Sequence, residues 1–542
     1  MRKEERTTIF LAAFDISGIQ DFIFATNRLK ENTGASIIVT DILRNELPKA
    51  LKKLEDKEAG YKVITDWEND NRSHNSPLDW IQEDIICAEI IYIGGGNAFV
   101  AYKDRDTYLK TRRNLAESLI KKCSYLTVSS SILEIPMIDF PEQRRILLKE
   151  LALKKRGMLR NQNLSVFSIV EQDNTFGLPI TDTEEWGENV TGTQKEKRLA
   201  FQKELINSRS IYQSTLQKEF SYATEMEHMA SEPGTDSFVA VVHIDGNGMG
   251  EMIHKSIDGM ATEFVEALTG MRKLSKEIAT TYRDVFSELM NQYTQHITTD
   301  YTSESGEKII PLRLVVLDGD DVTFICNASH GLPLAAAFIR ELIKMTNGRY
   351  TACAGVCLAH NHFPFRIAYE LAEDCCASAK ESWYRNKARS AGFIDFQLIR
   401  GASERELSKI REEMFTQKDM KGIITRPYQI MEEINLKDKE SFDCLYNQIS
   451  KLPCKKDGKS GEWPRNRLKR LYESYLKEGS DLEVLKLEYA SRGYHVDELA
   501  GGPDRSLFDA LEIMDYFDKE LYHKLFMFSE EIVEKEEGGS WV

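Results

Sequence analysis

The sequence predicts an α+β fold that contains two copies of one strand–helix–hairpin unit, followed by a helix-rich region. Apolar strand segments at 7–16 and 238–245 each carry an aspartate at or near their end, Asp15 and Asp245. Each segment is followed by helical periodicity and then by an apolar hairpin, with its tip at Gly94 or Asp318. The spacings from aspartate to tip, 94 − 15 = 79 and 318 − 245 = 73 residues, are similar, which indicates an internal duplication.

The elements of the first copy follow from their local patterns. The run "TTIFLAAFDI" (7–16) predicts a strand, and the next segment places Ile19, Phe22 and Ile23 on one helical face. Residues 84–102 predict two strands joined by a tight glycine turn. Between the copies, 141–235 mixes helical signals with a polar stretch at 181–198, for which we expect a mobile loop.

The second copy is longer and leads into the C-terminal region. Helices are predicted at about 261–295, 331–346 and 364–383, and strands at 313–326 (the hairpin), 350–360 and 391–399. The remainder, 401–542, is charged and rich in helical patterns. We therefore place domain boundaries near residues 140, 235 and 400.

Composition limits the functional classes that need to be considered. A chain of 542 residues with 42% hydrophobic residues can bury several cores, and its formal net charge of −16 predicts low affinity for bare DNA. Nine scattered cysteines indicate reduced thiols rather than disulfides. No apolar run reaches the ~20 residues of a membrane span, and the first apolar stretch is too short for a signal peptide. We expect a cytoplasmic protein that does not enter a membrane.

The stretch "LDGDD" (317–321) raises the main functional question. Taken alone, Asp318-Gly319 is a type I′ turn signal, and aspartates at a hairpin tip are most simply solvated. Asp245, however, ends a continuously apolar strand, and it would meet Asp320 or Asp321 if the hairpin pairs beside that strand. Converging carboxylates need a cation, and oxygen ligands near phosphates favour Mg²⁺. Two such ions could activate a 3′-hydroxyl and hold a triphosphate.

Several further segments give this pattern a family resemblance. The order strand–aspartate, helix, strand–DGDD–strand resembles the palm domain of nucleotide cyclases, GGDEF proteins and the Cas10 family (Cmr2/Csm1 type) of type III CRISPR effectors. "FDISGIQDFIFATNRLKENTGASIIV" and "IYIGGGNAFVAY" resemble the first Cas10 palm. "IDGNGMGEMI", "AGVCLAHNHFPFRIAYELAEDCCASAK" and "ITRPYQI" resemble its second palm and the start of its C-terminal helical domain.

The resemblance implies a fold and an activity. The fold would be two ferredoxin-like palm domains (1–140 and 236–400), an intervening α-rich domain without zinc (141–235) and a C-terminal helical domain (401–542). The activity would be a nucleotidyltransferase that joins ATP into cyclic oligoadenylate by two-metal chemistry with Mg²⁺ or Mn²⁺. The implied partners are the other subunits of a type III effector, guide RNA and target RNA.

The resemblance also implies roles for single residues. Asp245, Asp320 and Asp321 would be catalytic and would bind metal together with Gly246. Nucleotide would contact Gly246, Asn247, Gly248, Gly250, Asp318, Gly319 and Lys380, and a second ATP would contact Gly94, Gly95 and Gly96 of the first palm.

Some positions depart from the family pattern. Asp318 stands where the family has glycine, and Asn247 replaces the second acid of the strand. Residues 1–227 contain one histidine, His74, so no HD nuclease is expected, and 141–235 contain no cysteine for a zinc site. Two alternatives therefore stay open: a structural Cas10-like subunit with a weak palm, and a stand-alone cyclic nucleotide synthase.

Overall fold

The computed structural model shows two compact units. It describes residues 8–55, 60–68, 78, 80, 85–123, 126–157, 169–173, 177–184, 187–206, 212–229, 237–259, 264–299, 301–303, 305–386, 390–401, 406–414, 423–453, 463–477, 481–502 and 505–526. The first unit comprises 1–210, 248–282 and 316–320, and the second comprises 211–247, 283–315 and 321–542. His74 lies outside the described residues.

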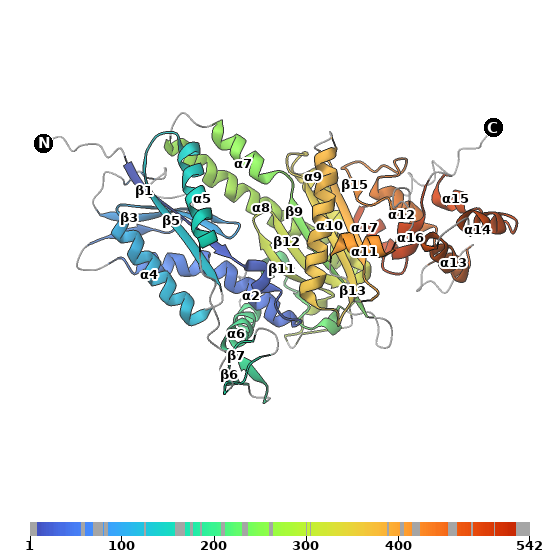
Figure 1. Ribbon diagram of the computed structural model, residues 1–542, viewed down its shortest axis with the longest axis horizontal. Helices are drawn as coiled ribbons and strands as arrows, with labels where there is room; N and C mark the ends of the chain where they lie inside the picture. The colour runs from blue at the N-terminus through green and yellow to red at the C-terminus, as the bar shows by residue number, and fades with distance from the viewer. Residues whose placement is uncertain are drawn as a thin grey trace. The chain divides into compact units, whose positions relative to one another are not determined.

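The first unit is built around a five-stranded sheet with the order β2-β3-β4-β1-β5. Figure 1 labels β1, β3 and β5 of this sheet. Its strands are β1 (Thr8–Ser17), β2 (Lys62–Ile64), β3 (Ile86–Gly94), β4 (Asn97–Tyr102) and β5 (Thr127–Pro136). Its first helices are α1 (Ile19–Ile23), α2 (Leu29–Asp41), a π-helical turn (Ile42–Glu46) and α3 (Leu47–Lys52), and α4 (Arg105–Lys122) and α5 (Phe140–Gly157) flank β5 in the chain. Strand β1 pairs antiparallel with both β4 and β5, so it is central.

The polar stretch 181–198 is not a loop over its described residues, and that expectation is wrong. Residues in it form β6 (Ile180–Thr183), β7 (Asn189–Thr191) and the start of α6 (Gly192–Ile206), while 185 and 186 lie outside the described residues. Thr191 and Gln194 form a reciprocal capping box: each side chain accepts a hydrogen bond from the other residue's backbone N–H. Helix α6 then packs so closely on α2 that a β-carbon at Gly34 would collide with the Lys197 carbonyl. Tertiary packing and this cap give regular structure to a segment whose composition predicted a mobile loop.

The second unit is built around a six-stranded sheet with the order β11-β12-β9-β13-β14-β15. Its strands are β9 (Phe238–Gly246), β11 (Leu312–Asp318), β12 (Asp321–Asn327), β13 (Ala352–His360), β14 (Gly392–Leu398) and β15 (Tyr428–Ile430). Short β8 (Phe220–Tyr222) and β10 (Lys308–Ile310) pair separately. Each sheet has four core strands, β1, β3, β4 and β5 in the first and β9, β11, β12 and β13 in the second. Numbered 1 to 4 along the chain, these strands lie in the order 2-3-1-4 across each sheet, which is the ferredoxin-like order. The predicted α+β duplication is therefore confirmed.

Helices cover both faces of the second sheet, which explains why β9 is continuously apolar. Helix α9 (Ala328–Met345) approaches one face, where Gly331 lies against Ala240 and Val356. Helix α10 (Phe365–Arg385) approaches the opposite face, where Gly355 lies against the Ala372 carbonyl. Consecutive strand residues point to opposite faces, so Gly355 and Val356 distinguish the two layers. Figure 1 shows α9 and α10 beside β9 and β13.

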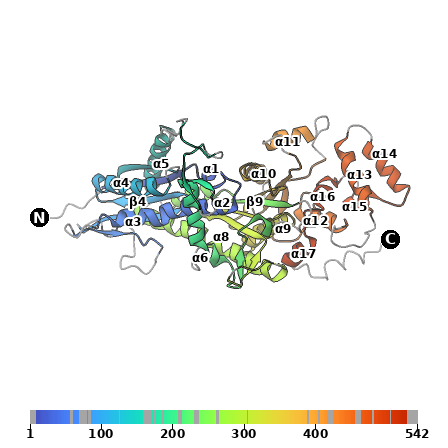
Figure 2. The ribbon, with the colours of Figure 1, turned by 90° about the horizontal axis from the view of Figure 1, so that it is seen from below.

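The remaining helices connect the sheets or follow them. They are α7 (Met249–Asp258), α8 (Phe264–His296) and α11 (Leu407–Met414), then α12 (Phe442–Ser450), α13 (Arg465–Leu476), α14 (Asp481–Ala490), α15 (Val496–Ala500), α16 (Phe508–Ile513) and α17 (Lys519–Phe526). Figure 2 gives a second view of these C-terminal helices. Among the described residues, none of these helices is both long and apolar enough to cross a membrane. The predicted helix-rich C-terminal region is present, and the boundaries at 140, 235 and 400 stay predictions.

Candidate functional site

Two of the predicted catalytic aspartates lie directly opposite each other on neighbouring strands. Asp245 is the last residue but one of β9, Asp321 is the first residue of β12, and the antiparallel register pairs them. Side chains of directly opposed residues lie on the same face of a sheet. The two side chains are 36% and 38% exposed, so both are open to solvent. The structure thus forms a paired carboxylate site at one end of β9 and β12.

A lysine lies beside one carboxylate and a histidine beside the other. The Lys380 ammonium from α10 forms an ion pair with Asp245 Oδ2. The ring of His243, buried against Tyr369 of α10, has its Nδ1 3.4 Å from Asp321 Oδ1 and 3.1 Å from Thr323 Oγ1. Two opposed carboxylates would otherwise destabilise the strand pair, so the Lys380 ammonium supplies compensating positive charge.

The same carboxylates change the protonation of their neighbours. Burial lowers the pKa of Lys380, but the Asp245 carboxylate outweighs burial and the pKa lies above its ordinary value. Burial likewise lowers the pKa of His243, and Asp321 outweighs it, so that pKa is also raised. Lys380 therefore stays charged at neutral pH.

The segment after Asp245 brings backbone rather than side chains to this end of the strand. Gly246 ends β9, and Gly248, with φ +62°, is the residue at which α7 begins. Gly250 lies in the first turn of α7, and no atom lies within 4 Å of the position of a β-carbon there. Asn247 is buried, and its amide donates to Thr351 Oγ1 at 3.0 Å. Asn247 thus anchors the β9 end to the start of β13.

The second hairpin has a different turn from the predicted one. Its two loop residues are Gly319 and Asp320, because β11 ends at Asp318 and β12 begins at Asp321. Gly319 has φ +63°, while Asp320 is not among the residues with positive φ. A positive φ at the first loop position only is the type II′ pattern, so the type I′ prediction is wrong. Asp320 therefore lies in the turn and not in the returning strand.

The first sheet contains an equivalent of the paired site with one carboxylate. Asp15 of β1 is paired in register with Asn97 of β4, as Asp245 is with Asp321. Lys155 of α5 forms an ion pair with Asp15, as Lys380 of α10 does with Asp245. The sequence did not predict this ion pair. The signal was present: each lysine lies on the helix that follows the fourth core strand of its copy.

The first hairpin has the glycine turn that was predicted. Gly95 and Gly96 have φ +58° and +72°, and positive φ at both loop positions is the type I′ pattern. Gly94 ends β3 and is paired with Asn97. The Asn97 side chain accepts a hydrogen bond from the Tyr92 hydroxyl at 2.8 Å. The turn of this hairpin carries no acid.

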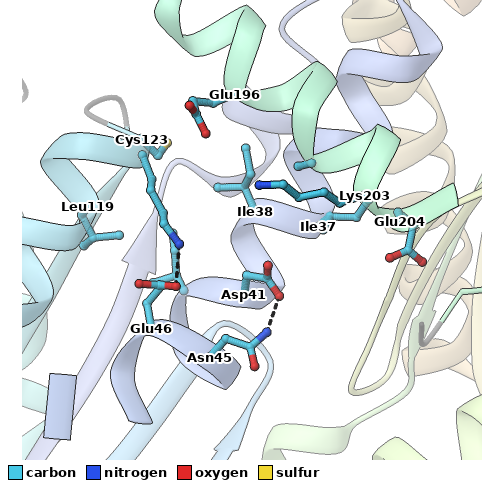
Figure 3. Close-up of a pocket in the computed structure, with 13 residues that line it drawn as sticks. Ile37, Ile38, Asp41, Asn45, Glu46, Leu119, Cys123, Glu196, Lys203 and Glu204 are labelled. Atoms are coloured by element: carbon cyan, nitrogen blue, oxygen red, sulfur yellow. Dashed lines mark hydrogen bonds and ion pairs between the residues drawn. The ribbon is translucent and has the colours of Figure 1, made fainter. Parts of the chain in front are cut away.

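A separate pocket of about 230 Å³ lies in the first unit, between α2, the π-helical turn, α4 and α6 (Figure 3). Its wall carries Asp41 and Glu46 beside apolar residues such as Ile37 and Leu119. Burial raises the pKa of Asp41. Burial also acts to raise the pKa of Glu46, but hydrogen bonds, the largest from Lys122, outweigh it and lower that pKa to about 2. None of the predicted site residues lines this pocket.

The comparison with family models decides which fold family the second sheet represents. Residues 238–389 match the family described as Cas10/Cmr2, second palm domain. This segment of the chain is a Cas10-type second palm domain. The matched segment contains Asp245, the hairpin 318–321 and Lys380, so the paired carboxylates lie within the Cas10 palm. No curated protein matches the chain.

Solved structures give a second comparison for the Cas10 fold. A Csm1–Csm4 cassette in complex with AMPPNP aligns with 97% of this chain and 70% of its own, at 12% identity and a TM-score of 0.50. A Csm1–Csm4 cassette in complex with one ATP aligns with 94% of this chain and 70% of its own, at 14% identity and a TM-score of 0.49. A Csm1–Csm4 subcomplex of a type III-A CRISPR-Csm interference complex aligns with 95% of this chain and 70% of its own, at 13% identity and a TM-score of 0.48. At such identities the first match shows a shared fold only.

Proposed function

We propose that this chain is a metal-dependent nucleotidyltransferase that joins ATP molecules into cyclic oligoadenylate, as the large subunit of an RNA-guided type III effector. The observation that carries the proposal is the register pair of Asp245 and Asp321 inside a Cas10/Cmr2 second palm. A similarly folded Csm1–Csm4 cassette holds AMPPNP, which supports a nucleotide as substrate.

The residues at the paired site fit a hard divalent cation. Two opposed carboxylates offer oxygen ligands, and they already attract the Lys380 ammonium. Among the described residues, no group of three or more His, Cys, Asp or Glu side chains is close enough to hold a metal ion. Water and phosphate oxygens would therefore complete the coordination of an ion bound at the two carboxylates. We propose Asp245, Asp321 and the Gly246 carbonyl as the protein ligands of Mg²⁺ or Mn²⁺, and metal binding by Asp320, which lies in the turn, stays a prediction. Bound there, the metal would neutralise phosphate charge and lower the pKa of the attacking 3′-hydroxyl.

The protein's own groups would then position the substrate. Lys380 lies close enough to Asp245 to move between that carboxylate and a triphosphate, and its raised pKa keeps it cationic. Gly246 and Gly248 carry no side chain, so we propose that their backbone approaches phosphate oxygens closely. In phosphoryl transfer, positioning and charge neutralisation provide most of the rate enhancement.

The duplicated sheet supplies a matched experiment. Asp321→Asn gives the second palm the aspartate–asparagine pair that Asp15 and Asn97 form in the first. We expect this change to lower product formation from radiolabelled ATP and Mg²⁺ or Mn²⁺ by about a hundredfold or more. Asp15→Asn, the control, removes an equally placed carboxylate from the first palm and should change the rate by less than about threefold.

The assay is run on the full chain with and without the effector complex and target RNA. Equal loss in both variants would contradict the assignment of catalysis to the second palm. No product from the unaltered chain under any condition would favour the structural-subunit alternative, while product without complex or RNA would favour the stand-alone synthase.

A further inference from the structure

A pair of buried polar side chains lies next to the paired carboxylates of the second sheet. His243 of β9 and Thr323 of β12 are opposite each other in register, two residues before Asp245 and two residues after Asp321. Residues two apart on a strand share a face, so all four side chains lie on one face of the sheet. Both members of the pair are buried, and Tyr369 of α10 packs edge-on against the His243 ring at 5.5 Å between ring centres. The carboxylates therefore have a polar layer behind them, between the sheet and α10.

The first sheet has apolar residues at the two equivalent positions. Ala13 of β1 and Phe99 of β4 are opposite each other in register, two residues from Asp15 and Asn97, and both are buried. The fold thus packs well without polar side chains at these positions. Burying an imidazole and a hydroxyl costs free energy unless both are hydrogen-bonded. The polar pair accompanies the sheet with two carboxylates and not the sheet with one, which indicates a role at the carboxylates rather than in packing.

Each carboxylate of the site is held through one of its oxygens. The Lys380 ammonium contacts Oδ2 of Asp245. The Nδ1 of His243 and the hydroxyl of Thr323 both lie 3.4 Å from Oδ1 of Asp321. A ring nitrogen of histidine donates a hydrogen bond only when it carries the proton, so the Nδ1–H form of His243 would orient this carboxylate. With Oδ1 engaged in this way, Oδ2 is the oxygen of Asp321 that remains for a ligand.

We propose that His243 is a positioning residue for Asp321: its Nδ1–H donates to Oδ1 and leaves Oδ2 to bind a divalent cation. Hydrogen bonds of this kind fix the orientation of a ligating carboxylate, and their loss lowers metal affinity by about 10–100-fold. The inference rests on the proposed function, because it takes a divalent cation as the ligand of Asp321. The competing interpretation is a packed core histidine whose Nδ1 accepts a hydrogen bond from the Thr323 hydroxyl and holds no carboxylate.

The experiment measures Mn²⁺ binding to the full-length chain without nucleotide, by electron paramagnetic resonance of the free ion and by isothermal titration calorimetry. Binding that Asp321→Asn abolishes is assigned to the paired carboxylates. We expect His243→Leu to weaken this binding by about tenfold or more, because no donor then holds Oδ1. His243→Asn places an amide nitrogen where histidine has Nδ1, and should bind Mn²⁺ within about threefold of the unaltered chain. His243→Gln places its nitrogen near the position of Nε2 instead, and should bind as weakly as His243→Leu.

A matched control separates metal binding from stability, and a spectrum tests the hydrogen bond directly. His330 of α9 also forms a hydrogen bond in the second unit, with Nδ1 2.8 Å from the Tyr293 hydroxyl. His330→Leu should therefore lower the free energy of unfolding in urea but leave the Mn²⁺ affinity unchanged. Nitrogen-15 nuclear magnetic resonance of the metal-free chain with labelled histidine should show a proton on Nδ1 of His243, identified as the signal that His243→Asn removes.

The outcomes separate this inference from the proposed function. If His243→Leu binds Mn²⁺ as tightly as the unaltered chain, or if Nδ1 carries no proton, His243 is a core histidine and the inference is wrong, while the proposed function stands. Equal weakening by His330→Leu, or no Mn²⁺ binding that depends on Asp321, would also overturn the inference. If the Mn²⁺ affinities follow the expected pattern but the unaltered chain forms no product from ATP, the positioning role stands and the proposed function fails.

Discussion

At the scale of single residues, Asp245 and Asp15 occupy the same place in two similarly ordered sheets but have different neighbours. Each forms an ion pair with a lysine of the helix that follows the fourth core strand, Lys380 or Lys155. Only Asp245 also faces a second carboxylate, that of Asp321. The second sheet therefore holds an excess of negative charge. Lys380 compensates part of it, and an added cation could compensate more.

This difference predicts how the protein responds to metal. In Lys380→Met the opposed carboxylates lose their nearest cation, so a divalent ion should stabilise the variant more than it stabilises the unaltered chain. We expect the increase in melting temperature on adding Mg²⁺ or Mn²⁺ to be larger in Lys380→Met by roughly 1–3 °C, measured by differential scanning fluorimetry. Lys155→Met, in which Asp15 faces Asn97, should show no such extra increase. An equal response in both variants would contradict metal binding at the paired carboxylates.

At the scale of elements, the position of Lys380 depends on how closely α10 approaches β13. Gly355 makes this approach possible, because a β-carbon there would lie 1.9 Å from the Ala372 carbonyl oxygen and 2.4 Å from the Cys376 nitrogen. Both contacts are with the helix backbone, which cannot move aside as a flexible side chain can. Any side chain at 355 must therefore displace α10, and Lys380 with it.

Gly355→Ala is accordingly expected to destabilise the second unit by about 1–3 kcal/mol, the usual cost of overpacking a core. Because Lys380 moves with α10, nucleotidyl transfer should fall as well. The control is Gly250→Ala in α7, where a β-carbon meets nothing within 4 Å and alanine should stabilise the helix by up to about 1 kcal/mol. Urea unfolding of both variants measures the difference, and a Gly355→Ala midpoint equal to that of the unaltered chain would refute the packing argument.

The sequence predicts the helices and strands themselves better than it predicts how the strands pair. Strand β9 and the hairpin strands were recognised because burial on both faces leaves continuous apolar runs. The register of these strands could not be predicted. A slip of one residue would turn Asp321 to the opposite face of the sheet without changing any local sequence pattern. Helix α6 was missed because its polar composition outweighed the short capping signal of Thr191 and Gln194.

At the scale of the whole molecule, a buried ionic cluster joins the C-terminal helices to the second sheet. The Arg426 side chain is fully buried, its Nη1 donates to Glu512 of α16 at 2.5 Å, and its guanidinium lies 4.4 Å from the Phe396 ring centre. Asp509 of α16 accepts from the Tyr428 hydroxyl at 2.8 Å. The "RPY" element that resembled the family thus connects β15 and β14 to the C-terminal helices.

Arg426→Met would leave two buried carboxylates without their guanidinium, which typically costs about 3–5 kcal/mol. We expect a correspondingly lower free energy of unfolding for the second unit in urea, with loss of the near-ultraviolet circular dichroism of the C-terminal aromatics. Arg385→Met, which removes an exposed ion pair with Glu381 on α10, should leave the unfolding free energy nearly unchanged. A similar small effect of both substitutions would show that the cluster does not connect the two regions.

The sequence by itself determined the duplicated α+β pattern, the acid-bearing second hairpin and the acid-free first one, because strand runs, glycine turns and aspartates are local features. Only the tertiary structure decided the partners of those aspartates. Lys380 meets Asp245 across 135 residues, and Gly96 meets Asp318 across 222. Such contacts follow from the strand order and from helix packing, and no local periodicity encodes them. Asp318, an ordinary turn residue in the sequence, has become the carboxylate held by the first hairpin.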